Sequence, residues 1–150
     1  MYQANLKELL QAGRLGKIHL GQAQDEFFEI LGTADYAHSS LVSYGDIEFY
    51  FEDTFRRLKL INLNFLSFWQ QKIPSGGKNL HLDPWVLKAG LDPEDLIKYL
   101  NQEAINFCDV EPVNFGTRQL SINKNTTVIF NNAIEESGDH IGLCKLSVGE

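Results

Sequence analysis

The sequence predicts an α+β fold in which two tandem helix-plus-antiparallel-sheet repeats pack into one unit, with the helices on one sheet face. Three observations carry this prediction. Some segments space apolar residues as a helix does, others alternate apolar and polar residues as half-buried strands do, and the same order of segments occurs twice. The chain of 150 residues is long enough to bury a substantial core.

Two helices are predicted in the first half of the chain. Residues 6–11 place three leucines at helical spacing, and residues 22–31 place aromatic and aliphatic residues in the same way. Gly32 would end the second helix. Asp25 and Glu26 would lie in its first turn, where the helix dipole favours negative charge.

Strands are predicted where apolar and polar residues alternate. Residues 47–51 and 58–65 both follow this pattern, and its apolar positions include Phe49, Phe51 and Phe65. Because neighbouring strands that alternate bury only one face, we expect an antiparallel sheet that is covered on one side.

A third helix is predicted near the start of the second half of the chain. Asp92 is a predicted N-cap, and Pro93 fits the first helical position because a hydrogen-bonded N–H is not needed there. Strands are then predicted at residues 118–123, 126–131 and 141–148, with a tight turn between the first two.

An internal repeat would explain why helices are followed by strands twice. An offset that sets Gly21 on Gly90 also aligns the helices predicted in the two halves. With a short insertion allowed, residues 44–51 then align with residues 115–122. Any two amphipathic helices followed by strands can align in this way, so that alternative stays open.

The predicted division is a first α+β repeat over residues 1–69, a linker over 70–83 and a second α+β repeat over 84–150. The linker is placed where Pro74-Ser75-Gly76-Gly77-Lys78 favours irregular chain. Each repeat is too small to bury its own sheet well, so we expect the two to pack together, as one compact domain or as a pair.

The segment Ile18–Gly32 resembles the opening of β-lactamase-inhibitor-protein-like domains and of the small lipoproteins of outer-membrane assembly, with an apolar-x-x-Gly sequence, a short helix and a Leu-Gly end. The resemblance implies a helical opening that leads into an antiparallel sheet. It also implies, as in the inhibitors, two tandem domains whose open sheet grips a partner. The chain departs from the lipoproteins because it has no cysteine near its start. The segment Tyr44–Phe49 is similar to a motif of uncharacterised bacterial proteins, which implies a bacterial origin.

The formal net charge of −7 limits the classes of partner. It argues against nucleic acid and against anionic membrane surfaces, which are bound through Lys and Arg, and it would suit a basic partner. With no basic amino-terminal region and no long apolar stretch, we expect a cytoplasmic protein. Cys108 and Cys144 are then expected to be reduced, buried and inert.

No residue pattern predicts catalysis. The four histidines lack a second metal ligand at helical or short-loop spacing, and no phosphate-binding or nucleophile motif occurs. Asp46 and Glu48 would share a strand face, but a general acid needs a burying pocket that the sequence does not indicate. We therefore expect no enzyme activity, no cofactor and no metal site.

The function predicted is a protein-binding module, most concretely an immunity- or inhibitor-type protein that blocks a toxin or an enzyme. Tyrosine and tryptophan are the expected anchors of such an interface. The predicted partner-binding residues are Glu48, Tyr50, Asn62, Asn64, Trp69, Gln119 and Ser121. The alternatives are a small-molecule-binding or enzymatic domain, with a pocket between helices and sheet near Tyr44 or Trp85, and a protein that forms homodimers.

Overall fold

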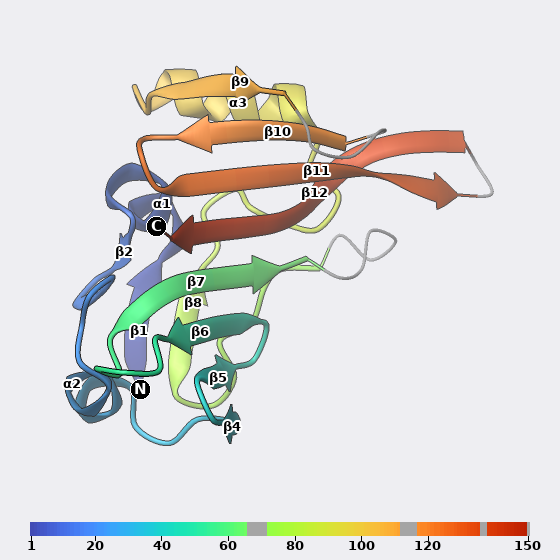
Figure 1. Cartoon of the computed structure of the whole chain (residues 1–150). Helices are drawn as coiled ribbons and strands as arrows, with labels where there is room; N and C mark the ends of the chain where they lie inside the picture. The colour runs from blue at the N-terminus through green and yellow to red at the C-terminus, as the bar shows by residue number, and fades with distance from the viewer. Residues whose placement is uncertain (66–71, 112–116, 136–137, 150) are drawn as a thin grey trace.

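The fold is α+β, with one large antiparallel sheet, two small sheets and three helices within the described residues of the computed structural model (Figure 1). The structure describes residues 1–65, 72–111, 117–135 and 138–149. The large sheet has eight strands in the order β4-β5-β6-β7-β12-β11-β10-β9. The α+β class predicted from the sequence is therefore confirmed.

The elements have the following bounds. The helices are α1 (Leu6–Ala12), α2 (Gln24–Leu31) and α3 (Pro93–Gln102). The strands outside the large sheet are β1 (Tyr2–Asn5), β2 (Arg14–Leu15), β3 (Ile18–His19) and β8 (Leu80–Asp83). The strands of the large sheet are β4 (Tyr36–His38), β5 (Leu41–Tyr44), β6 (Ile47–Phe51), β7 (Leu58–Asn64), β9 (Phe107–Val110), β10 (Thr117–Ile122), β11 (Thr126–Glu135) and β12 (Gly138–Gly149).

The helices begin and end where the local chemistry favours it. The side chain of Asp92 accepts a hydrogen bond from the N–H of Glu94 at 2.8 Å, and Pro93 is the first helical residue, so the predicted start of α3 is confirmed. Asn5 caps α1 in the same way. Gly13 ends α1 in the left-handed conformation, with φ of 69°, which glycine adopts without strain.

An aromatic cluster joins α2 to the first strands of the sheet. The ring of Phe27 lies 4.8 Å from that of Phe49 and 5.0 Å from that of Phe51, in edge-to-face geometry. The hydroxyl of Tyr44, another fully buried aromatic residue, donates to the carbonyl of Gly32 at 2.6 Å. The buried hydrophobic residues in the described part of the sheet are Val42, Tyr44, Ile47, Phe49, Phe51, Leu58, Ile61, Leu63, Leu120, Ile122, Val128, Phe130, Leu143, Leu146 and Val148.

The sheet is two meanders joined at one strand pair. Strands β4 to β7 follow α2 and form the first meander, and strands β9 to β12 follow α3 and form the second. They join where β7 pairs antiparallel with β12. The sequence offset that aligns residues 44–51 with 115–122 superposes β6 on β10. However, β6 is the third strand of the first meander, whereas β10 is the second strand of the second meander. That offset therefore does not match the meanders strand for strand.

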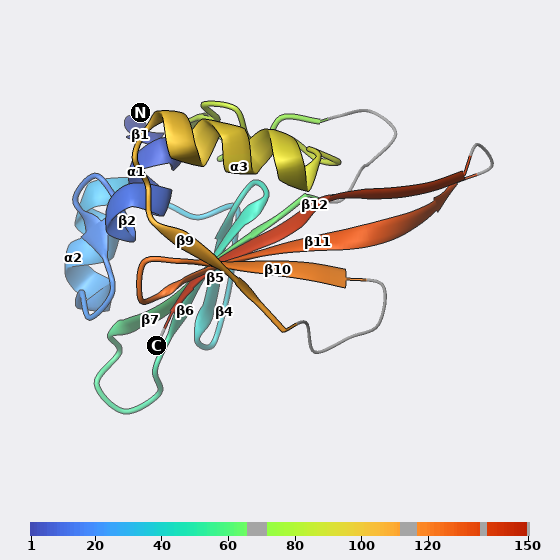
Figure 2. The same cartoon turned by 90° about the horizontal axis from the view of Figure 1, so that it is seen from above.

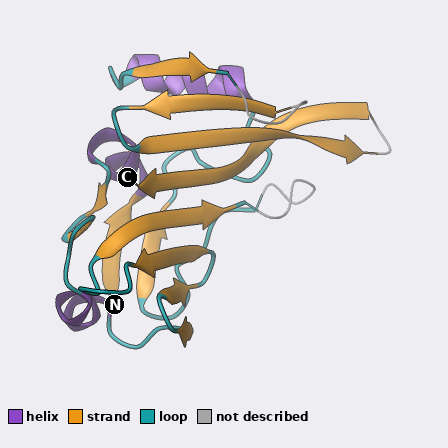
Figure 3. Ribbon diagram, viewed as in Figure 1, coloured by secondary structure: helices purple, strands orange, loops and turns teal. Residues whose placement is uncertain are grey.

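A parallel strand pair was not predicted. Strand β8 lies inside the range predicted as a linker, and it pairs in parallel with β1, with Gln3 opposite His81 and Asn5 opposite Asp83 (Figure 3). This part of the range is a regular strand, because the alternating Leu80 and Leu82 are buried. Figure 2 shows that β11 and β12 extend well beyond the neighbouring strands.

Candidate protein-interaction surface

One face of the large sheet carries a continuous row of polar side chains. Strand register sets each of them opposite the next, so a line of direct neighbours crosses the junction of the two meanders. We call this set the polar row and its side of the sheet the polar face. The polar row consists of Ser43, Glu48, Asn62, Ser147, Thr127 and Ser121.

The polar row continues onto both edge strands. Tyr36 of β4 lies opposite Ser43, and Cys108 of β9 lies opposite Ser121, and both of these edge residues are exposed. A second row runs beside it through Asn64, Lys145, Ile129, Gln119 and Val110. The polar face therefore draws side chains from every strand of the sheet.

Two hydrogen bonds fix side chains within the polar face. The hydroxyl of Tyr50 donates to Oε2 of Glu48 at 2.9 Å, and the hydroxyl of Ser147 donates to Oδ1 of Asn62 at 2.6 Å. Burial, followed by the hydrogen bond to Glu48, raises the pKa of Tyr50. Asn62 is only 7% exposed, since Glu48 and Ser147 flank it on the two neighbouring strands. The two hydrogen bonds hold these four side chains in fixed positions on the sheet.

The structure brings six predicted partner-binding residues onto this one face. They are Glu48, Tyr50, Asn62, Asn64, Gln119 and Ser121. The seventh, Trp69, lies outside the described residues. Three further residues of this face, Thr127, Lys145 and Ser147, were not predicted although their strands were, because the predicted face was confined to residues 47–51, 58–65 and 118–123.

Asp46 and Glu48 do not lie on the same strand. Strand β6 begins at Ile47, so Asp46 lies in the turn before it. Its carboxylate accepts a hydrogen bond from the N–H of Ser75 at 2.8 Å and lies 3.7 Å from the ammonium of Lys72. Asp46 therefore fixes the loop after the first meander.

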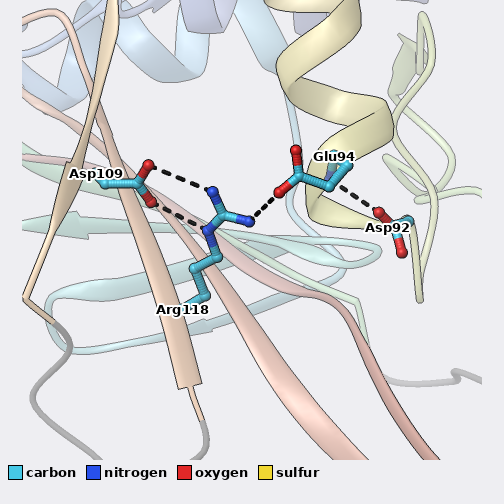
Figure 4. Close-up of polar contacts among 4 residues, drawn as sticks. All are labelled: Asp92, Glu94, Asp109 and Arg118. Carbon is cyan, nitrogen blue, oxygen red and sulfur yellow. Dashed lines mark hydrogen bonds and ion pairs between the residues drawn. The ribbon is translucent and has the colours of Figure 1, made fainter.

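The edge strand β9 is attached to α3 by an arginine. The guanidinium of Arg118, on β10, donates through Nε to Asp109 of β9 at 3.0 Å and through Nη1 to Glu94 of α3 at 2.5 Å (Figure 4). A second hydrogen bond to Asp109, donated by Nη2 at 3.3 Å, makes this contact bidentate. These hydrogen bonds raise the pKa of Arg118, which stays charged. The edge strand β9 is thus linked to α3 through one side chain of β10.

The two cysteines differ in exposure. Cys108 is exposed on β9, so the prediction of two buried thiols is wrong for this residue, because β9 is an edge strand and Cys108 alternates onto the polar face. Cys144 is half-buried, its Sγ lies 3.3 Å from the carbonyl oxygen of Ile129, and burial raises the pKa of its thiol.

No group of three or more His, Cys, Asp or Glu side chains in the described residues is placed to hold a metal ion. None of the helices described is long and apolar enough to cross a membrane. No protein-family model, curated protein or solved structure matches the chain.

Proposed function

We propose that the chain is a non-catalytic protein-binding module of the immunity or inhibitor type, which binds a toxin or an enzyme through the polar face. The polar row is the observation that carries this proposal, because it unites side chains of both meanders into one surface. We further propose that the polar face is open to solvent and that the helices cover the opposite face of the sheet. The packing of Phe27 of α2 on Phe49 and Phe51 supports that arrangement.

The chemistry of the polar face suits a polar partner surface. Serine and threonine hydroxyls, the amides of Asn64 and Gln119 and the carboxylate of Glu48 offer both donors and acceptors. Short side chains lose little rotamer freedom when they are ordered, which lowers the entropic cost of binding. The net charge of −7 would speed the encounter with a basic partner.

Duplication is part of the proposal. A helix followed by a four-stranded meander occurs in each half, and the β7–β12 pair lies where the halves meet. A module copied once would explain why the polar row runs through both halves, and why the tandem inhibitor-like domains resemble this chain in their opening segment. The bacterial and cytoplasmic setting belongs to the same proposal.

The test compares two charge-matched variants. Ser121→Arg with Thr127→Arg places two large cations on the polar face, and Gln11→Arg with Gln102→Arg places two on exposed positions of α1 and α3. Each variant is first shown to keep the wild-type circular dichroism spectrum and melting temperature. Proteins captured from a host extract are then identified, and the Kd of each is measured by calorimetry.

We expect one captured protein to bind the wild type and the helix variant equally. The polar-face variant should bind it at least about a hundredfold more weakly, since two buried unpaired charges cost several kcal/mol at an interface. Equal affinity for all three proteins would refute the polar face as the binding surface. Failure of the wild type to retain any protein at native expression would refute the function itself.

A further inference from the structure

Two clefts adjoin each other away from the large sheet. The first, of 690 Å³, lies along β1, β8 and residues 73–77. The second, of 450 Å³, lies between residues 84–92 and α3. Ile73 and Pro84 line both clefts, so the two meet at these residues. We call this the β8–α3 groove, and no strand of the eight-stranded sheet lines it.

The groove has exposed apolar residues at its margin. Ile73 is 57% exposed at the junction of the clefts, and Met1 is 79% exposed in the first cleft. Few large apolar side chains are so exposed in the described residues, and two of them line one groove. A groove that carries apolar side chains along its length suits an extended segment of chain, which covers them with alternate side chains.

The charged side chains that line the groove are mainly negative. Its carboxylates are those of Glu8, Asp83, Asp92 and Asp95, whereas Lys88 is the single Lys or Arg among its described lining residues. Three of these carboxylates have partners within the chain. Glu8 forms an ion pair with Arg14, Asp83 accepts a hydrogen bond from the N–H of Trp85, and Asp92 accepts one from the N–H of Glu94. The carboxylate of Asp95 has no hydrogen-bond or ion-pair partner within the described part of the chain.

Two aromatic rings stand beside Asp95 in the second cleft. The rings of Trp85 and Tyr99 lie 6.1 Å apart at 66°. The ammonium of Lys7, which does not line this cleft, lies 5.9 Å from the centre of the Trp85 ring. The Trp85 ring thus already contacts one cation of the chain, and that ammonium is also paired with Glu103 at 2.7 Å. Indole is the strongest side-chain acceptor for such a contact. The cleft itself adds the ring of Tyr99 and the exposed carboxylate of Asp95, and this combination favours an ammonium or a guanidinium.

We propose that the β8–α3 groove binds an extended basic segment of a partner protein. The end of the groove lined by Trp85, Tyr99 and Asp95 takes one Arg or Lys side chain of that segment. The apolar stem of the side chain lies against the rings while its charged head pairs with Asp95. This groove is separate from the polar face, so its test can fail while that of the polar face succeeds.

The first experiment asks whether the pocket selects a cation. Nitrogen-15-labelled protein is titrated with N-acetyl-arginine methylamide and, as a neutral analogue of the same shape, with N-acetyl-citrulline methylamide. The indole N–H signal of Trp85, assigned by its loss in Trp85→Phe, is followed by NMR. We expect a saturable shift with the arginine compound alone. No shift with it, or the same shift with citrulline, would overturn the proposal.

The second experiment removes the charge of the pocket. Asp95→Asn should weaken binding of the arginine compound by about fivefold or more, because the carboxylate pairs with the bound cation. Asp25→Asn makes the same change in the first turn of α2, also at an exposed position, and should leave binding unchanged. An equal effect of both variants would show only the influence of net charge and would refute the assigned pocket.

The third experiment distinguishes a peptide from a small molecule. A short capped peptide with one central arginine flanked by valines is titrated in the same way. It should bind about tenfold more tightly than the arginine compound, because the flanking residues cover the groove around Ile73. A peptide that binds no more tightly would identify a small-molecule site and overturn the assignment to an extended segment.

Discussion

Ser147 on β12 donates its hydroxyl to Oδ1 of Asn62 on β7 at 2.6 Å, across the strand pair where the two meanders join. The residues are far apart in sequence and belong to different halves of the chain. Their hydrogen bond lies at the middle of the polar row, and Asn62 is buried while Ser147 is half-buried. The same contact therefore supports both the sheet and the surface proposed for binding.

Removal of this hydrogen bond should destabilise the fold modestly. Asn62→Ala is expected to lower the free energy of unfolding by about 1–2 kcal/mol, because it also leaves the Ser147 hydroxyl without its partner. In a double-mutant cycle with Ser147→Ala, urea unfolding should give a coupling energy of about 0.5–1.5 kcal/mol. A coupling energy of zero would show that the bond contributes nothing to the junction. Thr127→Ala, which truncates another residue of the polar row, serves as the control substitution.

Loss of Arg118 should loosen the edge strand. The Arg118 side chain is 32% exposed and contacts Asp109 of β9 and Glu94 of α3, so Arg118→Ala should cost about 1 kcal/mol of unfolding free energy. Amide hydrogens of residues 107–110 should exchange faster than in the wild type. Arg118→Lys should recover little of the lost stability, because an ammonium group cannot make the bidentate contact with Asp109.

The control for Arg118 is another arginine with a weaker contact. Arg14 is more exposed and makes one hydrogen bond, of 3.2 Å, to Glu8. Arg14→Ala should therefore change the stability by less than about 0.5 kcal/mol and leave exchange of residues 107–110 unchanged. Equal effects of the two substitutions would contradict the role given to Arg118.

Alkaline pH should weaken the fold through Tyr44. Burial, with a smaller contribution from Asp35, raises the pKa of Tyr44 from 10.0 to about 12. The unfolded chain therefore loses this proton first, so the stabilising contribution is complete below pH 10 and declines as pH rises towards 12. The stability advantage of the wild type over Tyr44→Phe should fall by about 1.4 kcal/mol per pH unit in that window.

Urea unfolding of both proteins at a series of pH values measures this advantage. The comparison cancels the other groups that titrate at alkaline pH, because both proteins contain them. At neutral pH, Tyr44→Phe should cost about 1 kcal/mol through loss of the hydrogen bond to the Gly32 carbonyl. A difference in stability that stays constant with pH would show that Tyr44 titrates alike in the folded and unfolded chains.

The two cysteines should react with a thiol reagent at different rates. Cys108 is exposed and should react fast, whereas Cys144 is half-buried with a raised pKa and should react at least about tenfold more slowly in the folded protein. In denaturant the two rates should converge. Cys108→Ser should remove the fast phase and Cys144→Ser the slow one, and the opposite assignment would contradict the burial described.

Local signals predicted those elements whose chemistry is contained within a few neighbouring residues. Asp92 and Pro93 define the start of α3 by themselves, because the cap and the missing N–H act within one turn. The alternation of residues 47–51 placed Phe49 and Phe51 in the core and Glu48 and Tyr50 on the other face. The same alternation in β7 and β10 is why the other four of the six predicted partner-binding residues lie on that face as well.

Elements that depend on distant partners were not predictable in this way. Strand β8 is short and follows a stretch rich in glycine, and the alternation of Leu80 and Leu82 is too brief to distinguish it from a linker until β1 pairs with it. The exposure of Cys108 depends on β9 being an edge strand, which is a property of strand order. The Trp85 cleft likewise exists only because residues 84–92 pack beside α3.

The sequence by itself determined the helix ends, the alternation of most strands and the α+β class, because each rests on capping or periodicity within a short segment. Only the tertiary structure decided which strands are neighbours, and with that the β7–β12 junction, the continuous polar row and the β8–α3 groove. The physical reason is that strand pairing joins residues distant in sequence. Its free energy depends on how all the buried faces pack at once, and no single segment encodes it.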